Sequence, residues 1–183
     1  MTKVFIGGSR RISRLNADVR RRLDRIVEKG LAIVVVDASG ADKAVQQYLR
    51  GRGYERVEVF CSNGECRNNL GGWEMRSVPT PKGTRGIAFY SVKDEEMARE
   101  GTVGLMLWDG RSKGTLANME RLLKMKKKVV VYYAPNKVFF TLRSKKDLET
   151  LLSLGGKATL RKPRRAPRTL EHERYHVSQV SLF

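Results

Sequence analysis

Three polar, glycine-containing turns each follow an apolar stretch of the sequence. They read "GGSRR" at residues 7–11, "DASGAD" at 37–42 and "DGRSKGT" at 109–115. Glycine lets the backbone come close to a ligand, and the first N–H groups of a helix bind anions. Hydroxyls of Ser112 and Thr115 and a cation from Arg10 or Lys113 would add to such a site. These residue types predict recognition of a phosphate or a ribose phosphate.

None of the three turns is a complete phosphate-binding motif. "GGS" lacks the G-x-G-x-x-G spacing, and no lysine follows Gly114, so a Walker-type ATPase is not expected. At any single position the glycine is also explained by a strand-to-helix turn alone. Three such turns in one chain favour a ligand site, because the carboxyl ends of parallel strands meet at one edge of a sheet.

Strand-like and helix-like segments alternate along most of the chain. Apolar, β-branched runs predict strands at 3–8, 31–37, 56–60, 102–109, 128–134 and 137–144. Helical spacing predicts helices within 15–30, 41–50, 93–100, 115–125 and 146–156, the first capped by Asn16 and ended by Gly30. This alternation predicts an α/β fold, a three-layer sandwich with a mostly parallel sheet. We expect one domain over residues 1–156 and a basic arm over 157–183.

The stretch from 62 to 86 has five glycines, two prolines and no clear period. It is predicted either to contact a ligand or to be a mobile insertion. Trp73 would stack on a base or pin the loop by packing, and Arg67 and Asn68 beside it would read phosphate or base edges. Cys61 and Cys66 are expected to be reduced, and with His172 and His176 too distant in sequence, no metal site is expected.

The formal net charge is +18, of which the arm carries seven basic and two acidic residues. Such a charge attracts polyanions, so non-specific nucleic-acid binding is expected at low salt. No apolar run is long enough to cross a membrane, and the basic start "MTKVFIGGSRR" does not read as a signal peptide. We therefore expect a cytoplasmic protein with no membrane partner.

The order "FIGGSRR", "DASGADKAVQQYL", "RNNLGGW", "KDEEMA" and "LWDGRSKGTLANMERL" resembles the SLOG superfamily. This group of Rossmann-like proteins includes the lonely guy phosphoribohydrolases and the DNA-processing protein A. The chain is most similar to the small bacterial branch with GSR, GAD and WDGxSxGT motifs, over about Lys3 to Tyr133. The resemblance implies a Rossmann-like fold, a nucleotide-type ligand at the carboxyl edge of the sheet, and a homodimer. We expect no cofactor.

Carried over by motif, the resemblance assigns ligand-binding roles to residues of all three turns. These are Gly8, Ser9 and Arg10; Gly40, Ala41 and Asp42; and Asp109, Gly110, Ser112, Gly114 and Thr115. The glutamate of the lonely guy motif "PGGxGTxxE" falls at Asn118, and the upstream arginine falls at Lys93, so both positions are expected at the site. Because asparagine cannot serve as a general base, this type of hydrolysis is in doubt.

Two carboxylates remain as catalytic candidates. Asp94 is next to Lys93, and Asp109 ends a strand, where it would bind a ligand, cap the turn or take part in catalysis. Three functions therefore stay open: binding of a nucleotide or nucleotide-derived molecule as sensor or processing protein, cleavage of an N-glycosidic bond by Asp109 or Asp94, and binding of DNA or RNA through the positive charge.

Overall fold

A computed structural model describes residues 2–81, 83 and 86–158 of the chain. The arm predicted from residue 157 onward therefore lies almost wholly outside the described residues. The strands are β1 (Lys3–Gly8), β2 (Ala32–Val36), β3 (Val57–Ser62), β4 (Glu74–Val78), β5 (Val103–Trp108), β6 (Lys128–Tyr133) and β7 (Val138–Leu142). The helices are α1 (Ala17–Glu28), α2 (Ala41–Gly51), α3 (Gly86–Glu100), α4 (Lys113–Lys124) and α5 (Lys145–Ala158).

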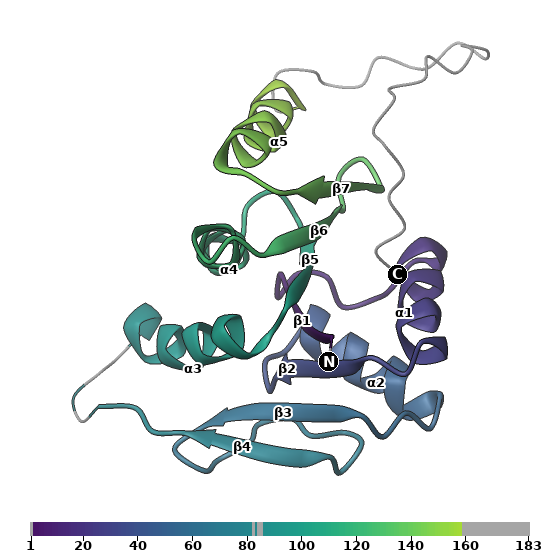
Figure 1. The fold of residues 1–183 in the computed structure, drawn as a ribbon, viewed down its shortest axis with the longest axis vertical. Coiled ribbons are helices and arrows are strands. Elements are labelled where there is room, and N and C mark those ends of the chain that lie inside the picture. Colours follow the sequence, from purple (N-terminus) through teal and green to yellow (C-terminus); the bar gives the residue numbers. More distant parts are fainter. Residues whose placement is uncertain (1, 82, 84–85, 159–183) are drawn as a thin grey trace.

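All seven strands form one sheet in the order β4-β3-β2-β1-β5-β6-β7 (Figure 1). The first six are parallel, and β7 pairs antiparallel with β6 as a hairpin. This is the predicted α/β, Rossmann-like architecture with a mostly parallel sheet. The strand order reverses at β1, which lies between β2 and β5, and ligands of such sheets bind in the crevice at this reversal.

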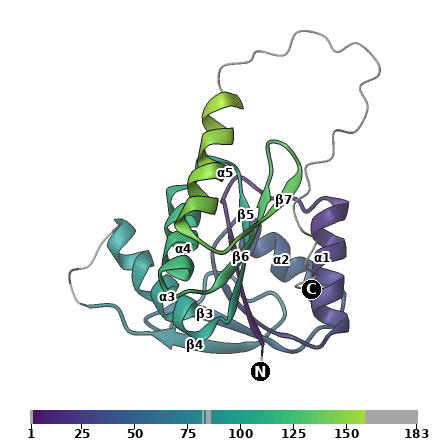
Figure 2. The same ribbon diagram turned by 45° about the horizontal axis from the view of Figure 1, so that its top comes forward.

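Two hydrophobic cores lie on the two faces of the sheet. Strand side chains alternate between them, so that Val4 and Ile6 belong to one core and Phe5 to the other. Helices α1 and α2 cover the first face, and α3, α4 and α5 cover the second, as Figures 1 and 2 show. Burial on both faces explains why the parallel strands are almost continuously apolar.

Helix α1 begins as predicted. The side chain of Asn16 accepts a hydrogen bond from the backbone N–H of Val19 at 2.9 Å, and Gly30 has a φ of +59° just beyond the helix end. Two elements differ from the expectation: α3 begins seven residues earlier than the predicted start at 93, and residues 74–78 form a strand inside the stretch expected to be irregular.

Strand β4 was missed because it is an edge strand with little buried apolar surface. Only Val78 of its five residues is buried, and Met75 is 56% exposed, so the alternation that marks a half-buried strand is absent. Within the described residues, the longest apolar helical stretch is too short and too polar to span a lipid bilayer.

Candidate functional site

A cavity of about 590 Å³ lies at the carboxyl ends of β1 and β5. Residues of all three predicted turns line it, so the turns meet at one place as the parallel topology requires. Of the predicted site residues, it is lined by Gly8, Arg10, Asp42, Lys93, Asp94, Asp109, Ser112, Gly114, Thr115 and Asn118. Its size is in the range of about 300–1,000 Å³ that small-molecule sites occupy.

Ser9 joins the first turn to the third. Its buried hydroxyl donates to Asp109 Oδ1 at 3.0 Å and accepts from the Asp109 backbone N–H at 3.1 Å. The same hydroxyl lies 3.4 Å from Thr115 Oγ1, which in turn donates to Ser112 Oγ at 2.9 Å. Ser9 therefore holds the two turns in register behind the cavity wall and is not one of the lining residues.

Asp109 caps its own turn. Its Oδ1 accepts from the backbone N–H groups of Arg111 at 3.0 Å and Ser112 at 2.8 Å, which is the geometry of an Asx turn. Burial acts to raise the pKa of Asp109, but these N–H groups and the Ser9 hydroxyl outweigh it and hold the pKa below the ordinary value. Asp109 is thus an ionised carboxylate already engaged by the protein through one oxygen.

Helix α4 opens onto the mouth of the cavity. Ser112 is its N-cap and accepts from the Thr115 N–H at 3.3 Å, so Lys113 and Gly114 occupy the first turn. A Cβ added to Gly114 would meet no atom within 4 Å. Four of the residues that line the cavity are exposed and basic, and we call them the cationic rim: Arg10, Arg11, Arg111 and Lys113.

The second turn packs tightly against the first. Gly40 has a φ of +80°, and a Cβ there would lie 2.2 Å from the carbonyl oxygen of Arg10. A Cβ on Gly8 would lie 2.5 Å from that of Ala41. Close packing thus accounts for Gly8, Gly40 and Ala41, and a φ of +78° accounts for Gly110. Gly40, Ala41 and Gly110 support the cavity and do not line it.

Two further carboxyls line the cavity, one from α2 and one from α3, and we call Asp42 and Asp94 the acidic floor. Asp42 is buried in the first turn of α2, and Asp94 of α3 is half-buried. Burial, and then the charge of Asp94, raise the pKa of Asp42 well above its ordinary value. Burial also raises the pKa of Asp94, against the opposing effects of Asn118, Arg121 and Lys93.

Asn118 contacts the acidic floor. Its Nδ2 donates to Asp94 Oδ2 at 3.2 Å, and its Oδ1 accepts from Arg121 at 2.6 Å. Arg121 also donates to the hydroxyl of Ser91. The position where the resemblance places a catalytic glutamate is therefore neutral, but a carboxylate from the neighbouring helix lies within hydrogen-bond distance of it.

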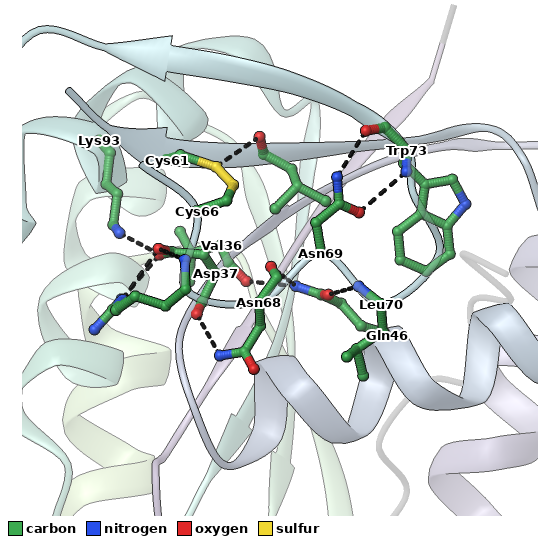
Figure 3. The surroundings of a disulfide bond; sticks show 12 residues. Val36, Asp37, Gln46, Cys61, Cys66, Asn68, Asn69, Leu70, Trp73 and Lys93 are labelled. Carbon is green, nitrogen blue, oxygen red and sulfur yellow. Dashed lines mark hydrogen bonds and ion pairs between the residues drawn. A yellow bond between two sulfur atoms is a disulfide. The ribbon is translucent and has the colours of Figure 1, made fainter. Parts of the chain in front are cut away.

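The sequence did not single out Asp37, which directly follows β2 and is almost fully buried. Figure 3 shows its contacts. Asp37 accepts from Arg67 through the backbone N–H and Nε, both at 3.0 Å, through Nη2 at 2.8 Å, and from Lys93 Nζ at 2.5 Å. Burial acts to raise the pKa of Asp37, but these bonds lower it to about 2. The feature of the sequence that could have identified Asp37 as a site residue is its position directly after a strand, which it shares with Asp109.

Lys93 and Arg67 therefore contact Asp37 as well as lining the cavity. Asn68 donates to the Asp37 carbonyl at 2.8 Å, so the loop after β3 is held against the end of β2. The prediction that Arg67 and Asn68 read a ligand stays open, but their contacts in the structure are with the protein.

The two cysteines correct an expectation. Cys61 and Cys66 form a disulfide at the base of the same loop, whereas the sequence suggested reduced thiols (Figure 3). Their Cα atoms are 5.0 Å apart, within the range that a disulfide needs. The turn of the chain after β3 brings the two cysteines together. Their separation of five residues in the sequence does not by itself predict this contact.

Trp73 packs and does not stack on a ligand. It is 5% exposed, its Nε1 donates to the Tyr54 carbonyl at 2.8 Å, and Asn69 bonds both its N–H and its carbonyl group. The alternative in which Trp73 pins the loop is therefore the correct one. No group of three or more potential metal ligands occurs among the described residues, and His172 and His176 lie outside them.

Comparisons with known proteins identify the fold but no family. No family model and no curated protein matches the chain. Among solved structures it is similar to DNA processing protein A from Helicobacter pylori, reported for its single-stranded DNA binding mode, with 16% sequence identity and a TM-score of 0.58. The match covers 84% of this chain and 73% of the other. At this identity the likeness shows a shared Rossmann-like fold.

Proposed function

We propose that this chain binds a mononucleotide, or a small molecule derived from one, in the cavity at the carboxyl ends of β1 and β5. The observation that carries the proposal is the set of polar groups that line this one cavity. Exposed cations line it near the start of α4, and the carboxyls of Asp42 and Asp94 line it beside the buried Lys93 and the half-buried Arg121. A molecule with an anionic group and a neutral, polar group fits this lining.

The phosphate would lie at the cationic rim. The first-turn amides of Lys113 and Gly114 sit at the positive end of the α4 dipole, and a phosphate there would be bound by N–H groups and by charge-assisted bonds from the rim. Gly114 leaves space for this approach. The acidic floor is less suited to a phosphate than the cationic rim is, so the sugar and base would lie toward the floor, with ribose hydroxyls near Asp109.

A substitution at Gly114 tests this orientation. We expect Gly114→Leu to weaken binding of nucleoside monophosphates by about tenfold or more, since the new side chain would occupy the mouth of the cavity. Leucine favours a helix over glycine, so the fold should not lose stability. Isothermal titration calorimetry with the adenosine, guanosine, cytidine and uridine monophosphates measures the affinity.

Gly51→Leu is the matched control. Gly51 is also a helical glycine where an added Cβ would meet no atom within 4 Å. It is the last residue of α2, at the opposite end of that helix from Asp42. The control should bind as the unmodified chain does. Unchanged affinity in Gly114→Leu would show that the phosphate does not use the start of α4.

Cleavage of an N-glycosidic bond is the second candidate, and Asp94 is the observation that favours it. A carboxyl whose pKa is raised by burial is suited to protonate a leaving base. Asp94 fits this role better than Asp109, whose pKa is lowered. Incubation with the four monophosphates and NAD, followed by chromatography, would reveal a free base. Release that disappears in Asp94→Asn supports this candidate, and absence of release alongside tight binding excludes it.

Single-stranded DNA is the third candidate ligand, because DNA processing protein A is reported to bind it and this chain carries a net charge of +18. Binding through charge would weaken steeply as salt is added. If a mononucleotide competes with an oligonucleotide at constant ionic strength, the two share the cavity; if it does not, DNA uses another surface.

A further inference from the structure

Asp42 has a buried oxygen that the protein leaves unsatisfied. Its side chain lines the cavity, the residue is 3% exposed, and Oδ1 has no hydrogen-bond partner among the described residues. Buried polar atoms nearly always have a partner, because leaving one unpaired is costly. Because Asp42 is among the residues that line the proposed ligand site, a small turn of its side chain on binding would let a ligand supply the missing bond.

The surroundings of Asp42 disfavour a charge on it. Burial opposes ionisation most strongly, and the carboxylates of Asp94 and Asp37 add to this effect. Lys93 acts in the opposite direction, but its Nζ lies 2.5 Å from Asp37 Oδ1, and Arg121 donates to Asn118 and Ser91. A carboxyl in such a place keeps its proton more readily and can then donate a hydrogen bond, as an ionised carboxylate cannot.

Asp94 accepts a hydrogen bond through one of its oxygens, and its neighbours fix this. Arg121 can only donate, so the Asn118 oxygen must face it at 2.6 Å. The Asn118 NH₂ group therefore faces Asp94 Oδ2, 3.2 Å away, and that oxygen accepts. The floor thus offers the Asp42 carboxyl, whose Oδ1 has no partner among the described residues, and the Asp94 carboxyl, whose Oδ2 accepts from Asn118.

We propose that the acidic floor reads the base of the nucleotide, with Asp42 donating from a protonated carboxyl to a ring nitrogen or carbonyl oxygen and Asp94 accepting from an adjacent N–H. This inference rests on the proposed function and adds the ligand class: a group in which an acceptor lies beside an N–H donor, as on the pairing edge of a nucleobase or in a carboxamide.

The experiment compares each monophosphate with ribose 5-phosphate, which keeps the sugar and phosphate but lacks the base. We expect at least one monophosphate to bind about tenfold or more tightly than ribose 5-phosphate. Asp42→Asn should keep this preference within about threefold, because its amide replaces the O–H donor with an N–H donor. Asp42→Leu should abolish the preference and leave ribose 5-phosphate binding unchanged.

Asp94→Asn provides a second variant should Asp42→Leu fail to fold. In Asp94→Asn the oxygen of the new amide would face the Asn118 NH₂ group, so the new NH₂ group would face the base. The base then meets a donor in place of an acceptor, and the preference for the monophosphate over ribose 5-phosphate is lost. Glu120→Gln, on the exposed side of α4, removes the same charge outside the cavity and should bind normally. The infrared band of a protonated carboxylic acid should also be present in the unmodified chain and absent in Asp42→Asn.

Four outcomes separate the inference from the function. A preference kept in Asp42→Asn and lost in Asp94→Asn supports the inference. Equal losses in Asp42→Asn and Asp42→Leu overturn it, since Asp42 would then act as an ionised acceptor. Ribose 5-phosphate binding as tightly as every monophosphate overturns the inference but leaves the proposed function standing. Failure of all five compounds to bind refutes the function, and the inference with it.

Discussion

Replacing Asp37 by asparagine should lower the free energy of unfolding at pH 7 by about 3–5 kcal/mol, the range found when one partner of a buried ion pair is removed. The Asp37 and Lys93 side chains are only 2% and 3% exposed, and their atoms lie 2.5 Å apart. The substitution would leave a buried ammonium facing a neutral amide, and it would also weaken the three bonds from Arg67. Urea unfolding followed by tryptophan fluorescence measures the change.

Asp18→Asn is the control for this prediction. Asp18 also pairs with an arginine, Arg21, but both side chains are largely exposed, and such pairs contribute roughly 0–1 kcal/mol. If the two variants lose equal stability, the Asp37 network does not hold the loop after β3 against the end of β2.

The same network predicts how stability depends on pH. Because the folded pKa of Asp37, about 2, is below the ordinary value of 3.8, its contribution is fully present above pH 4 and is lost as pH falls toward 2. The shift corresponds to roughly 2 kcal/mol. The raised pKa values of Asp42 and Asp94 change the stability with pH in the opposite direction. The quantity to follow is therefore the difference in free energy of unfolding between the unmodified chain and Asp37→Asn. This difference should become smaller below pH 4.

Much of the fold follows from local patterns in the sequence. The run Ala32–Val36 is apolar at every position, and Val19, Leu23 and Ile26 fall on one face of a helix; both patterns are strong because each element buries its surface against the sheet. Strand β4 has no such pattern, because its backbone pairs with β3 while most of its side chains are exposed.

The candidate site could be located from the sequence, but its internal bonds could not. Strand-end turns identify the edge of the sheet where Asp42, Asp109 and Thr115 meet. The contact of Asp37 with Arg67 and Lys93 joins residues 30 and 56 positions apart, and only the folded chain brings them together. The same holds for Asp109, whose capping role depends on where the N–H groups of Arg111 and Ser112 point.

Gly40→Ala is expected to be the other strongly destabilising substitution. The backbone there has φ +80° and ψ −125°, a region that L-residues other than glycine rarely adopt, and the new Cβ would lie 2.2 Å from the Arg10 carbonyl oxygen and 2.4 Å from its Cα. Both atoms are backbone, so no side chain can turn aside. Strain and overpacking together should cost about 3 kcal/mol or more.

Gly53→Ala separates the two causes of this loss. Gly53 has a φ of +60°, but a Cβ there would meet nothing within 4 Å, so its substitution should cost only about 1 kcal/mol from the backbone conformation. The excess in Gly40→Ala then measures how tightly the second turn packs against the first. Equal losses in urea unfolding would show that the two turns can move apart. A larger loss in Gly40→Ala, together with weaker nucleotide binding by the folded fraction, would show that this packing sets the distance between Arg10 at the mouth of the cavity and Asp42 at its floor.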